Sequence, residues 1–261
     1  MGDLSRMPVL FIGHGSPMNA IEHNRFTEAL AGLSKRLPRP KAICVVSAHW
    51  TTRGTEVLAV GRPRTIHDFY GFPAPLYEVE YPAPGDPAGA AGLARELGIK
   101  TDETWGFDHG AWSVLRHLYP QADIPVFELS LDEQRSLERH VDLGREIARL
   151  RERGVLIVGS GNIVHNLRRL AGEKETPPFA WTVDFDARVK KAIEERDLGS
   201  LAAPEAWGKE LAAIAHPTLE HYVPLLYCLG STSERDSVSY PYEGFEYGSL
   251  SMRMVLFEEP N

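Results

Sequence analysis

The chain has 261 residues, of which 43% are hydrophobic and 25% are charged, enough for one large core or at most two small ones. Its net charge of −8 and pI of about 5.7 exclude the basic footprint of a nucleic-acid-binding protein. No apolar run approaches the ~18 residues of a membrane span, and the first apolar stretch is too short for a signal peptide. We therefore expect a cytoplasmic protein with neither a nucleic-acid nor a membrane partner.

The two cysteines, Cys44 and Cys228, both lie inside apolar runs of the sequence. Such positions predict buried thiols and not a disulfide framework. Free thiols of this kind fit a reducing compartment.

Short apolar runs typical of strands alternate with amphipathic segments typical of helices, which predicts an α/β architecture. The predicted strands are 8–12, 42–47, 124–129, 155–158 and 250–257. The first four are apolar throughout, as a sheet buried on both faces requires, whereas 250–257 alternates imperfectly and is expected at an edge. The predicted helices are 25–37, 136–153, which ends at the C-cap residue Gly154, 182–196 and 218–229. We see no linker or repeat and expect a single domain over residues 1–261.

Two segments do not fit this alternation. Residues 61–87 are dense in proline, glycine and aromatic side chains, and residues 231–249 are similar but more polar. Long irregular segments in a compact domain are usually functional or disordered, and aromatic side chains favour burial. We expect 61–87 to be an ordered loop over a site.

Histidines at the ends of predicted strands are the main functional signal. His14, His49 and His165 each follow a strand, where open α/β sheets place their ligand crevice. His109 lies between a tryptophan-containing loop and a helix, and His221 lies on the last predicted helix. Neutral imidazole is the commonest protein ligand of Zn and Fe(II), so the pattern predicts a mononuclear metal site.

The other histidines and the remaining motifs give less information about function. His23, His117 and His140 lie on predicted helix faces among charges and are expected to be solvated, whereas His67 either lines the site or caps a loop. The chain has no HExxH, CxxC or EF-hand pattern. GHGS is not a nucleophile elbow, and GSGNIV lacks the third glycine of a dinucleotide-binding motif.

Seven motifs in order give the sequence a family resemblance. They are GHGSPMN, SAHW, TIHDFYGFP, YPAPG, WGFDHGAW, SGNIVHN and HPTLEHYVPLLY, running from residue 13 to 227. The set resembles the 4,5-DOPA extradiol dioxygenases, a branch of the class III extradiol ring-cleavage dioxygenases in the LigB-like superfamily. The resemblance implies one α/β domain with a central, mostly parallel sheet and helices on both faces.

The resemblance also implies roles for five histidines. His14, His49 and His221 match metal ligands of the family. His165 matches an acid/base group that also lies close enough to contact the metal, and His109 matches a residue that binds substrate or dioxygen. One divalent metal per chain, Zn or Fe(II), is implied, with Fe(II) expected for catalysis because Zn has no redox chemistry.

One feature departs from the usual arrangement of two histidines and a carboxylate in non-haem iron oxygenases. Glu220 and His221 are adjacent, and neighbouring helical residues point about 100° apart, so only one of them should face the metal. Following the family, we expect His221, with Glu220 as the alternative.

The implied reaction inserts both atoms of O2 into a catechol such as L-DOPA, giving a ring-opened aldehyde. Ser16, His67, Phe69 and Tyr70 are the expected substrate contacts, and Phe72 joins the aromatic wall around the ring. The sequence leaves open the physiological catechol, 4,5 against 2,3 cleavage, the native metal and the oligomeric state. A Zn-dependent hydrolase or a non-enzymatic binding protein are the alternatives.

Overall fold

The computed structural model describes residues 6–260, and its main feature is an eight-stranded sheet in the order β4-β3-β5-β2-β6-β1-β10-β7. The strands of this sheet are β1 (Val9–Gly13), β2 (Ala42–Thr52), β3 (Glu56–Leu58), β4 (Lys100–Asp102), β5 (Val126–Asp132), β6 (Val155–Gly161), β7 (Ser237–Ser239) and β10 (Met254–Glu258). A separate pair consists of β8 (Phe245–Glu246) and β9 (Leu250–Ser251).

The four central strands β5, β2, β6 and β1 all run parallel. β10 pairs antiparallel with β1, and β3 pairs antiparallel with β5, so strand direction reverses on both sides of the parallel centre. The carboxyl ends of the four parallel strands consequently meet at one edge, where α/β sheets bind their ligands.

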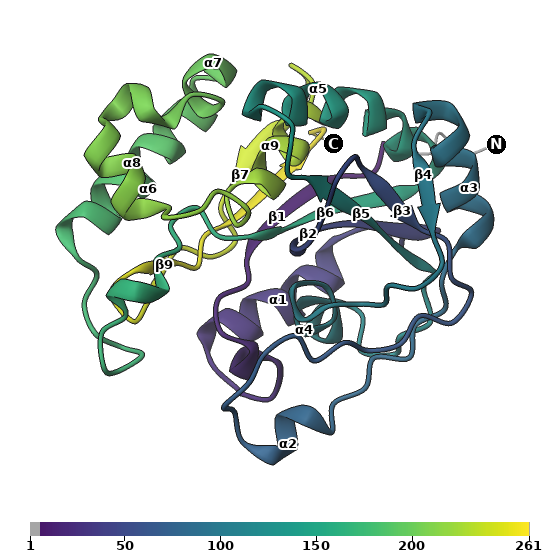
Figure 1. The fold of residues 1–261 in the computed structure, drawn as a ribbon, viewed down its shortest axis with the longest axis horizontal. Coiled ribbons are helices and arrows are strands. Elements are labelled where there is room, and N and C mark those ends of the chain that lie inside the picture. The colour runs from purple at the N-terminus through teal and green to yellow at the C-terminus, as the bar shows by residue number, and fades with distance from the viewer. Residues whose placement is uncertain (1–5, 261) are drawn as a thin grey trace.

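Helices cover both faces of the sheet (Figure 1). The α-helices in the described part of the chain are α1 (Arg25–Arg36), α2 (Ala74–Tyr77), α3 (Pro87–Leu97), α4 (His109–Leu118), α5 (Leu137–Ile147), α6 (Ala180–Glu194), α7 (Leu198–Leu201), α8 (Lys209–Ala215) and α9 (Val223–Gly230). Short 3₁₀ segments are η1 (Pro17–Ala20), η2 (Ala148–Arg153), η3 (Leu167–Arg169) and η4 (Pro204–Trp207). None of the helices within residues 6–260 has the length and apolar character to cross a membrane.

Alternate residues of each central strand enter opposite cores. In β1, Phe11 belongs to the core cluster that also contains residues of α3, α5, α6 and α9, whereas Leu10 belongs to the cluster that contains residues of α1 and α4. Because both faces are buried, every position of such a strand must be apolar, which is why the predicted strands were apolar runs. The predicted α/β fold with a mostly parallel sheet and helices on both faces is confirmed, and Cys44 and Cys228 are buried free thiols.

Two strand predictions differ substantially from the structure, whereas the other three differ by one to three residues at their ends. β2 does not end at residue 47 but continues to Thr52, with a register shift against β5 between Val46 and Thr51. Residues 250–257 form β9 and β10 and not one strand, and β10 lies inside the sheet between β1 and β7 instead of at its edge. The imperfect alternation of apolar and polar residues in 250–257 reflects the break between β9 and β10. β10 itself is buried on both faces and so does not alternate.

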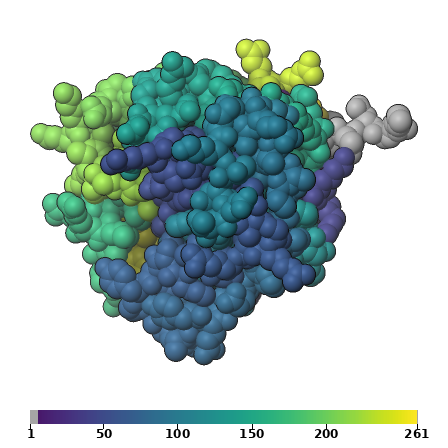
Figure 2. Space-filling model, turned by 45° about the vertical axis from the view of Figure 1, so that its right-hand side comes forward, coloured from purple at the N-terminus to yellow at the C-terminus, as the bar shows by residue number. Residues whose placement is uncertain are grey.

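The segment 61–87 is an ordered loop that contains α2 and leads into α3. It forms the lower, blue part of the face in Figure 2. A parallel bridge from Thr65 to Phe107 and another from Gly85 to Val126 attach it to the rest of the chain. Its predicted order is confirmed.

Of the three histidines expected to be solvated, His23 is exposed, whereas His117 is half-buried and binds the Asn19 carbonyl oxygen at 2.8 Å. His140 is buried, so the prediction was wrong there. His140 and Gly144 lie on the same face of α5, and Gly144 has no side chain to keep α9 at a distance. α9 therefore packs closely enough for the Tyr227 hydroxyl to reach His140 Nδ1 at 3.1 Å.

His140 should make the protein less stable in acid. Burial, and then the charge of Arg135, lowers the pKa of His140 to about 4, below its unfolded value near 6.5. The unfolded chain therefore binds a proton that the folded chain does not, and stability falls as the pH drops from 6.5 towards 4. Between pH 7 and pH 5, wild type should lose about 2 kcal/mol more unfolding free energy than His140→Gln, measured by urea denaturation. Parallel stability curves for the two proteins would contradict this prediction.

Candidate metal and substrate site

Five histidines from different parts of the chain converge at the carboxyl edge of the parallel strands. His14 follows β1 directly, His49 lies in the irregular part of β2, and His109 is the first residue of α4. His165 follows β6 by four residues, and His221 lies in a turn two residues before α9. The prediction that the last helix carries His221 was therefore wrong, since α9 begins only at Val223.

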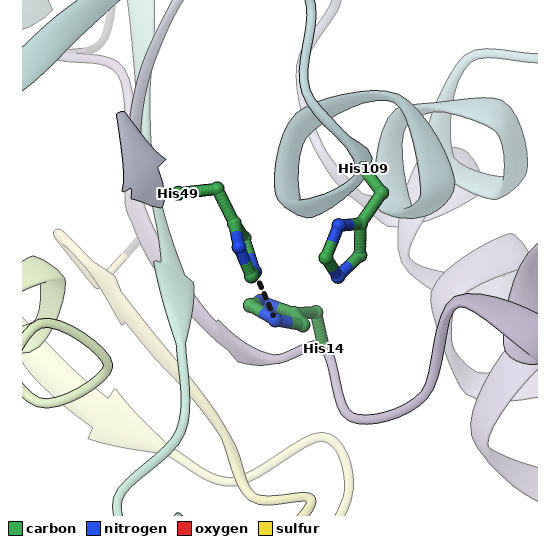
Figure 3. Close-up of side chains that lie close together, drawn as sticks. All are labelled: His14, His49 and His109. Atoms are coloured by element: carbon green, nitrogen blue, oxygen red, sulfur yellow. Dashed lines mark hydrogen bonds between the residues drawn. The ribbon is translucent and has the colours of Figure 1, made fainter. Parts of the chain in front are cut away.

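The imidazole rings are in direct contact. Figure 3 shows His14, His49 and His109 turned towards one another, with 3.1 Å between the Nε2 atoms of His14 and His49. The ring of His221 lies 5.4 Å from that of His14 and 5.0 Å from that of His49, centroid to centroid. His165 stacks on His221 at 3.5 Å with an interplanar angle of 5°. The structure thus brings together all five histidines predicted for the site.

Local backbone features explain this convergence. The shift in β2 takes His49 out of regular strand pairing, so its side chain is free of the alternation that would direct it into a core. Gly161 lets the chain before α9 approach β6, because a Cβ there would lie 2.1 Å from the His221 carbonyl oxygen. The backbone N–H of Asn162 donates to that same carbonyl at 2.8 Å. The two glycines of GSGN therefore serve close packing, Gly161 against His221 and Gly159 against Pro224 and Cys228 of α9.

A serine fixes the tautomer of His14. The Ser160 hydroxyl donates its single hydrogen to the Gly110 carbonyl oxygen at 2.6 Å and lies 2.9 Å from His14 Nδ1. Since that hydrogen is already used, His14 Nδ1 must carry the proton of this contact and donate it to Ser160. The lone pair of His14 is then on Nε2, which faces His49.

One carboxylate orients two more rings. Asp68 Oδ2 lies 2.9 Å from His109 Nδ1 and 3.3 Å from His49 Nδ1, and Asp68 Oδ1 accepts the backbone N–H of His109 at 2.9 Å. Burial would raise the pKa of Asp68, but the hydrogen bond and charge of His109, together with His49, lower it to about 2. Asp68 is therefore a carboxylate that accepts from His109 Nδ1, and its negative charge beside His49 Nδ1 favours the proton on that nitrogen as well, which leaves both Nε2 atoms bare.

Glu220 contacts the Nδ1 atom of His221, as Asp68 contacts the Nδ1 atoms of His49 and His109. Glu220 Oε1 lies 3.3 Å from His221 Nδ1 and accepts the Thr218 hydroxyl at 2.8 Å. His221 lines the central cavity, whereas Glu220 lines a neighbouring one. The geometry favours His221 as the residue that faces the site, with Glu220 orienting its ring.

This arrangement fits a divalent metal ion. The Nε2 atoms of His14 and His49 both carry lone pairs and face each other at 3.1 Å, close to the ~3.3 Å between two nitrogens on one tetrahedral Zn ion. One ligand atom each of His14, His49 and His109 lies within 4.8 Å of the others. Burial, followed by the neighbouring histidines, lowers the pKa of His14 well below its usual value, so the ring is neutral and able to bind a cation. His109 belongs to this tight group, nearer to the metal ligands than expected.

His165 differs from the other four, because its ring has no side-chain hydrogen bond among the described residues. Its backbone is held, with His165 N–H donating to Ala215 O at 3.0 Å. Burial, followed by His216 and His109, lowers the pKa of His165 to about 3. A neutral imidazole with free nitrogens at a cavity wall is available to exchange protons with a ligand.

The histidines form the floor of a cavity of about 540 Å3. Ser16, Phe69, Tyr70 and Phe72, all expected to contact substrate, line its wall. His67 does not: its Nε2 lies 3.0 Å from the Val79 carbonyl oxygen, and its ring packs on Trp112 inside the loop. The alternative role, capping the loop, is the one the structure supports.

The sequence analysis missed several functional positions. Asp68 was visible as the acidic residue of the TIHDFYGFP motif, but nothing in the sequence joined it to His49 and His109. Ser160 and Glu220 are known as ring partners only from their geometry. Six further residues complete the cavity wall: Gly15, Pro17, Leu167, Leu170, Tyr247 and Leu250.

Comparison with known proteins places the chain in a family. Residues 8–251 match the model described as the catalytic LigB subunit of aromatic ring-opening dioxygenase. The chain is 46% identical to a 4,5-DOPA dioxygenase extradiol of Escherichia coli (strain K12), over 96% of this chain and 94% of that protein. It is 35% identical to a protein of the same name from Beta vulgaris, over 92% of each. The crystal structure of an uncharacterised protein from Escherichia coli K12 matches with a TM-score of 0.83 at 42% identity, over 96% of this chain and 99% of that one.

The chain belongs to the LigB family of aromatic ring-opening dioxygenases, and its α/β fold matches that of the solved structure. Within it, the chain is a member of the 4,5-DOPA extradiol dioxygenase family, as its ordered motifs predicted.

Removing the charge of Asp68 should weaken metal binding. Asp68→Asn leaves one of the two Nδ1 atoms without a good acceptor, so the rings lose their fixed orientation. We expect metal affinity to fall about 10- to 100-fold, measured by competition with a chelator. Glu80→Gln, an exposed acidic position in the same loop, is the matched control and should bind as wild type does. Equal affinity in Asp68→Asn and wild type would show that Asp68 does not orient the ligands.

Proposed function

We propose that this chain is a metal-dependent extradiol dioxygenase that inserts both atoms of O2 into a catechol such as L-DOPA, giving a ring-opened aldehyde. The observation that carries the proposal is the group of ligand atoms of His14, His49 and His109 within 4.8 Å of one another, in a cavity with aromatic walls that His165 also lines. Relatives named 4,5-DOPA dioxygenase extradiol support the choice of substrate class.

We assign the metal to His14, His49 and His221, with His165 close enough to contact it. His109 forms a tight group of ligand atoms with His14 and His49, whereas His221 groups with His165 and Glu220. Fe(II) bound there supplies the redox chemistry that O2 requires and lowers the pKa of the catechol hydroxyls, whereas Zn supplies only the second effect.

His165 is the proposed acid/base. As a neutral ring it accepts a proton from a catechol hydroxyl and returns that proton later in the reaction, so one residue serves both steps. Its stacking on His221 keeps the ring beside the proposed metal position. The buried environment that lowers its pKa ensures that it is unprotonated when substrate arrives.

His109 and Asp68 form a proposed charge-stabilising pair. When the second catechol hydroxyl gives its proton to His109 Nε2, the Asp68 carboxylate at Nδ1 stabilises the resulting imidazolium. The Nε2–H can then donate to negative charge that develops on oxygen. Phe69 lies edge-on to His109 at 5.6 Å between ring centroids and helps to exclude water from this pair.

The remaining expectations concern the chain as a whole. We propose that residues 1–261 work as one catalytic domain in the cytoplasm, with a catechol and O2 as its small-molecule partners. The match of the family model to residues 8–251 supports the first part. The acidic net charge supports the expectation of no nucleic-acid partner.

Metal-dependent oxygen uptake tests the proposal. Metal-free protein is loaded anaerobically with Fe(II), mixed with L-DOPA and exposed to air, while oxygen uptake and a new yellow absorbance are followed. Uptake is expected with Fe(II) and not with Zn. His165→Ala should lower the rate about 10²- to 10⁴-fold because it removes the acid/base group. His23→Ala, at a side chain that is 87% exposed, is the control and should retain the wild-type rate.

Absence of oxygen uptake would indicate a different class of protein. If the Fe(II) form takes up no oxygen with L-DOPA or simple catechols, the dioxygenase proposal fails. Activity of the Zn form on esters or amides without oxygen demand would then identify a hydrolase.

A further inference from the structure

The mouth of the cavity is lined by exposed apolar side chains. Tyr70 is 92% exposed, Leu167 is 59% exposed and Leu170 is 43% exposed, and all three line the cavity. Tyr70 comes from the loop 61–87, and the two leucines come from the segment after β6. Exposed apolar side chains that gather around one opening are typical of a surface that a ligand covers.

The charges around the cavity are unfavourable to an anion. Apart from histidine, Asp68 is the ionisable carboxylate in the wall, and no lysine or arginine of residues 6–260 lines it. Lys174, whose backbone oxygen accepts from the N–H of the wall residue Tyr247, has its ammonium held by the carboxylates of Glu22 and Glu246. Arg168 and Arg169 are exposed next to Leu167 but are not part of the wall.

We infer that the preferred catechol carries an uncharged, apolar ring substituent, alkyl or aryl, and that a carboxylate on this substituent is disfavoured. The inference rests on the proposed function, which puts the two hydroxyl groups at the histidines. The substituent on the far side of the ring then extends towards Leu167 and Leu170.

Two physical effects act in the same direction. An apolar substituent removes its own surface and that of the leucines from water, which is favourable in proportion to the area covered. A carboxylate at the same place loses hydration without gaining a cationic partner and is repelled by Asp68. L-DOPA, which has a carboxylate, would therefore be cleaved but would not be the best substrate.

A matched pair of catechols tests this preference. 3-(3,4-Dihydroxyphenyl)propanoate and 4-(3,4-dihydroxyphenyl)butan-2-one have nearly the same shape, but only the first is charged. With the Fe(II) enzyme, we expect kcat/KM to be about tenfold higher for the ketone. A kcat/KM for the acid that equals or exceeds that for the ketone would overturn the inference.

Variants at the mouth of the cavity test whether Leu167 and Leu170 cause the preference for the uncharged catechol. Leu170→Lys adds a cation where the substituent should lie, so the ratio of kcat/KM between ketone and acid should fall towards one or reverse. Leu167→Lys should lower the same ratio, and it replaces Leu170→Lys as the test if that variant does not fold. Val183→Lys adds the same charge at an exposed apolar position on α6 outside the cavity and should leave the ratio unchanged. An unchanged ratio in both mouth variants would overturn the inference.

Binding separates this inference from the proposed function. The shift in melting temperature of the Zn-loaded protein reports binding of each compound without turnover. Tighter binding of the ketone with no cleavage of either compound would support the preference but not the dioxygenase. Tighter binding of the acid that is lost in Arg168→Gln or Arg169→Gln would overturn the preference and assign carboxylate recognition to these arginines.

Discussion

The site depends on packing the rings of His14, His49, His165 and His221 together inside the protein without charging them. If two neighbouring rings were protonated, their charges would repel in a poorly hydrated space, so burial and mutual proximity hold His14, His49 and His221 neutral. Neutral rings in turn require acceptors for their N–H groups. Ser160, Asp68 and Glu220 provide them behind the rings, which leaves the lone pairs directed inwards.

The fold supplies these partners from elements that are distant in sequence. The parallel centre of the sheet brings the chain after β1 next to the chain after β6, so Ser160 reaches His14 across 146 residues. The loop 61–87 brings Asp68 over the same edge, and the turn before α9 brings Glu220 and His221 together. A single loop therefore provides both the carboxylate that orients the histidine rings and the aromatic wall of the cavity.

The sequence predicted much of the fold because burial on both faces requires apolar strands. The sequence was less reliable for the burial and the role of single histidines, because these depend on contacts with other elements. His140 lies among charged residues in the sequence but is buried in the structure, since the close approach of α5 and α9 at Gly144 is a property of the helix pair. His67 belongs to a functional motif but supports the loop from inside, because its ring packs on Trp112.

The sequence by itself determined the α/β class, the family and the identity of the five histidines, because these depend on residue type, local periodicity and motif order. Only the tertiary structure decided which nitrogen of each ring is free, that Asp68 serves two rings, and that Glu220 stands behind His221. Hydrogen bonds of this kind depend on distances between segments far apart in the chain, and no local pattern encodes such distances. The apolar mouth is equally a tertiary property, because Tyr70 and Leu170 meet only in the folded chain.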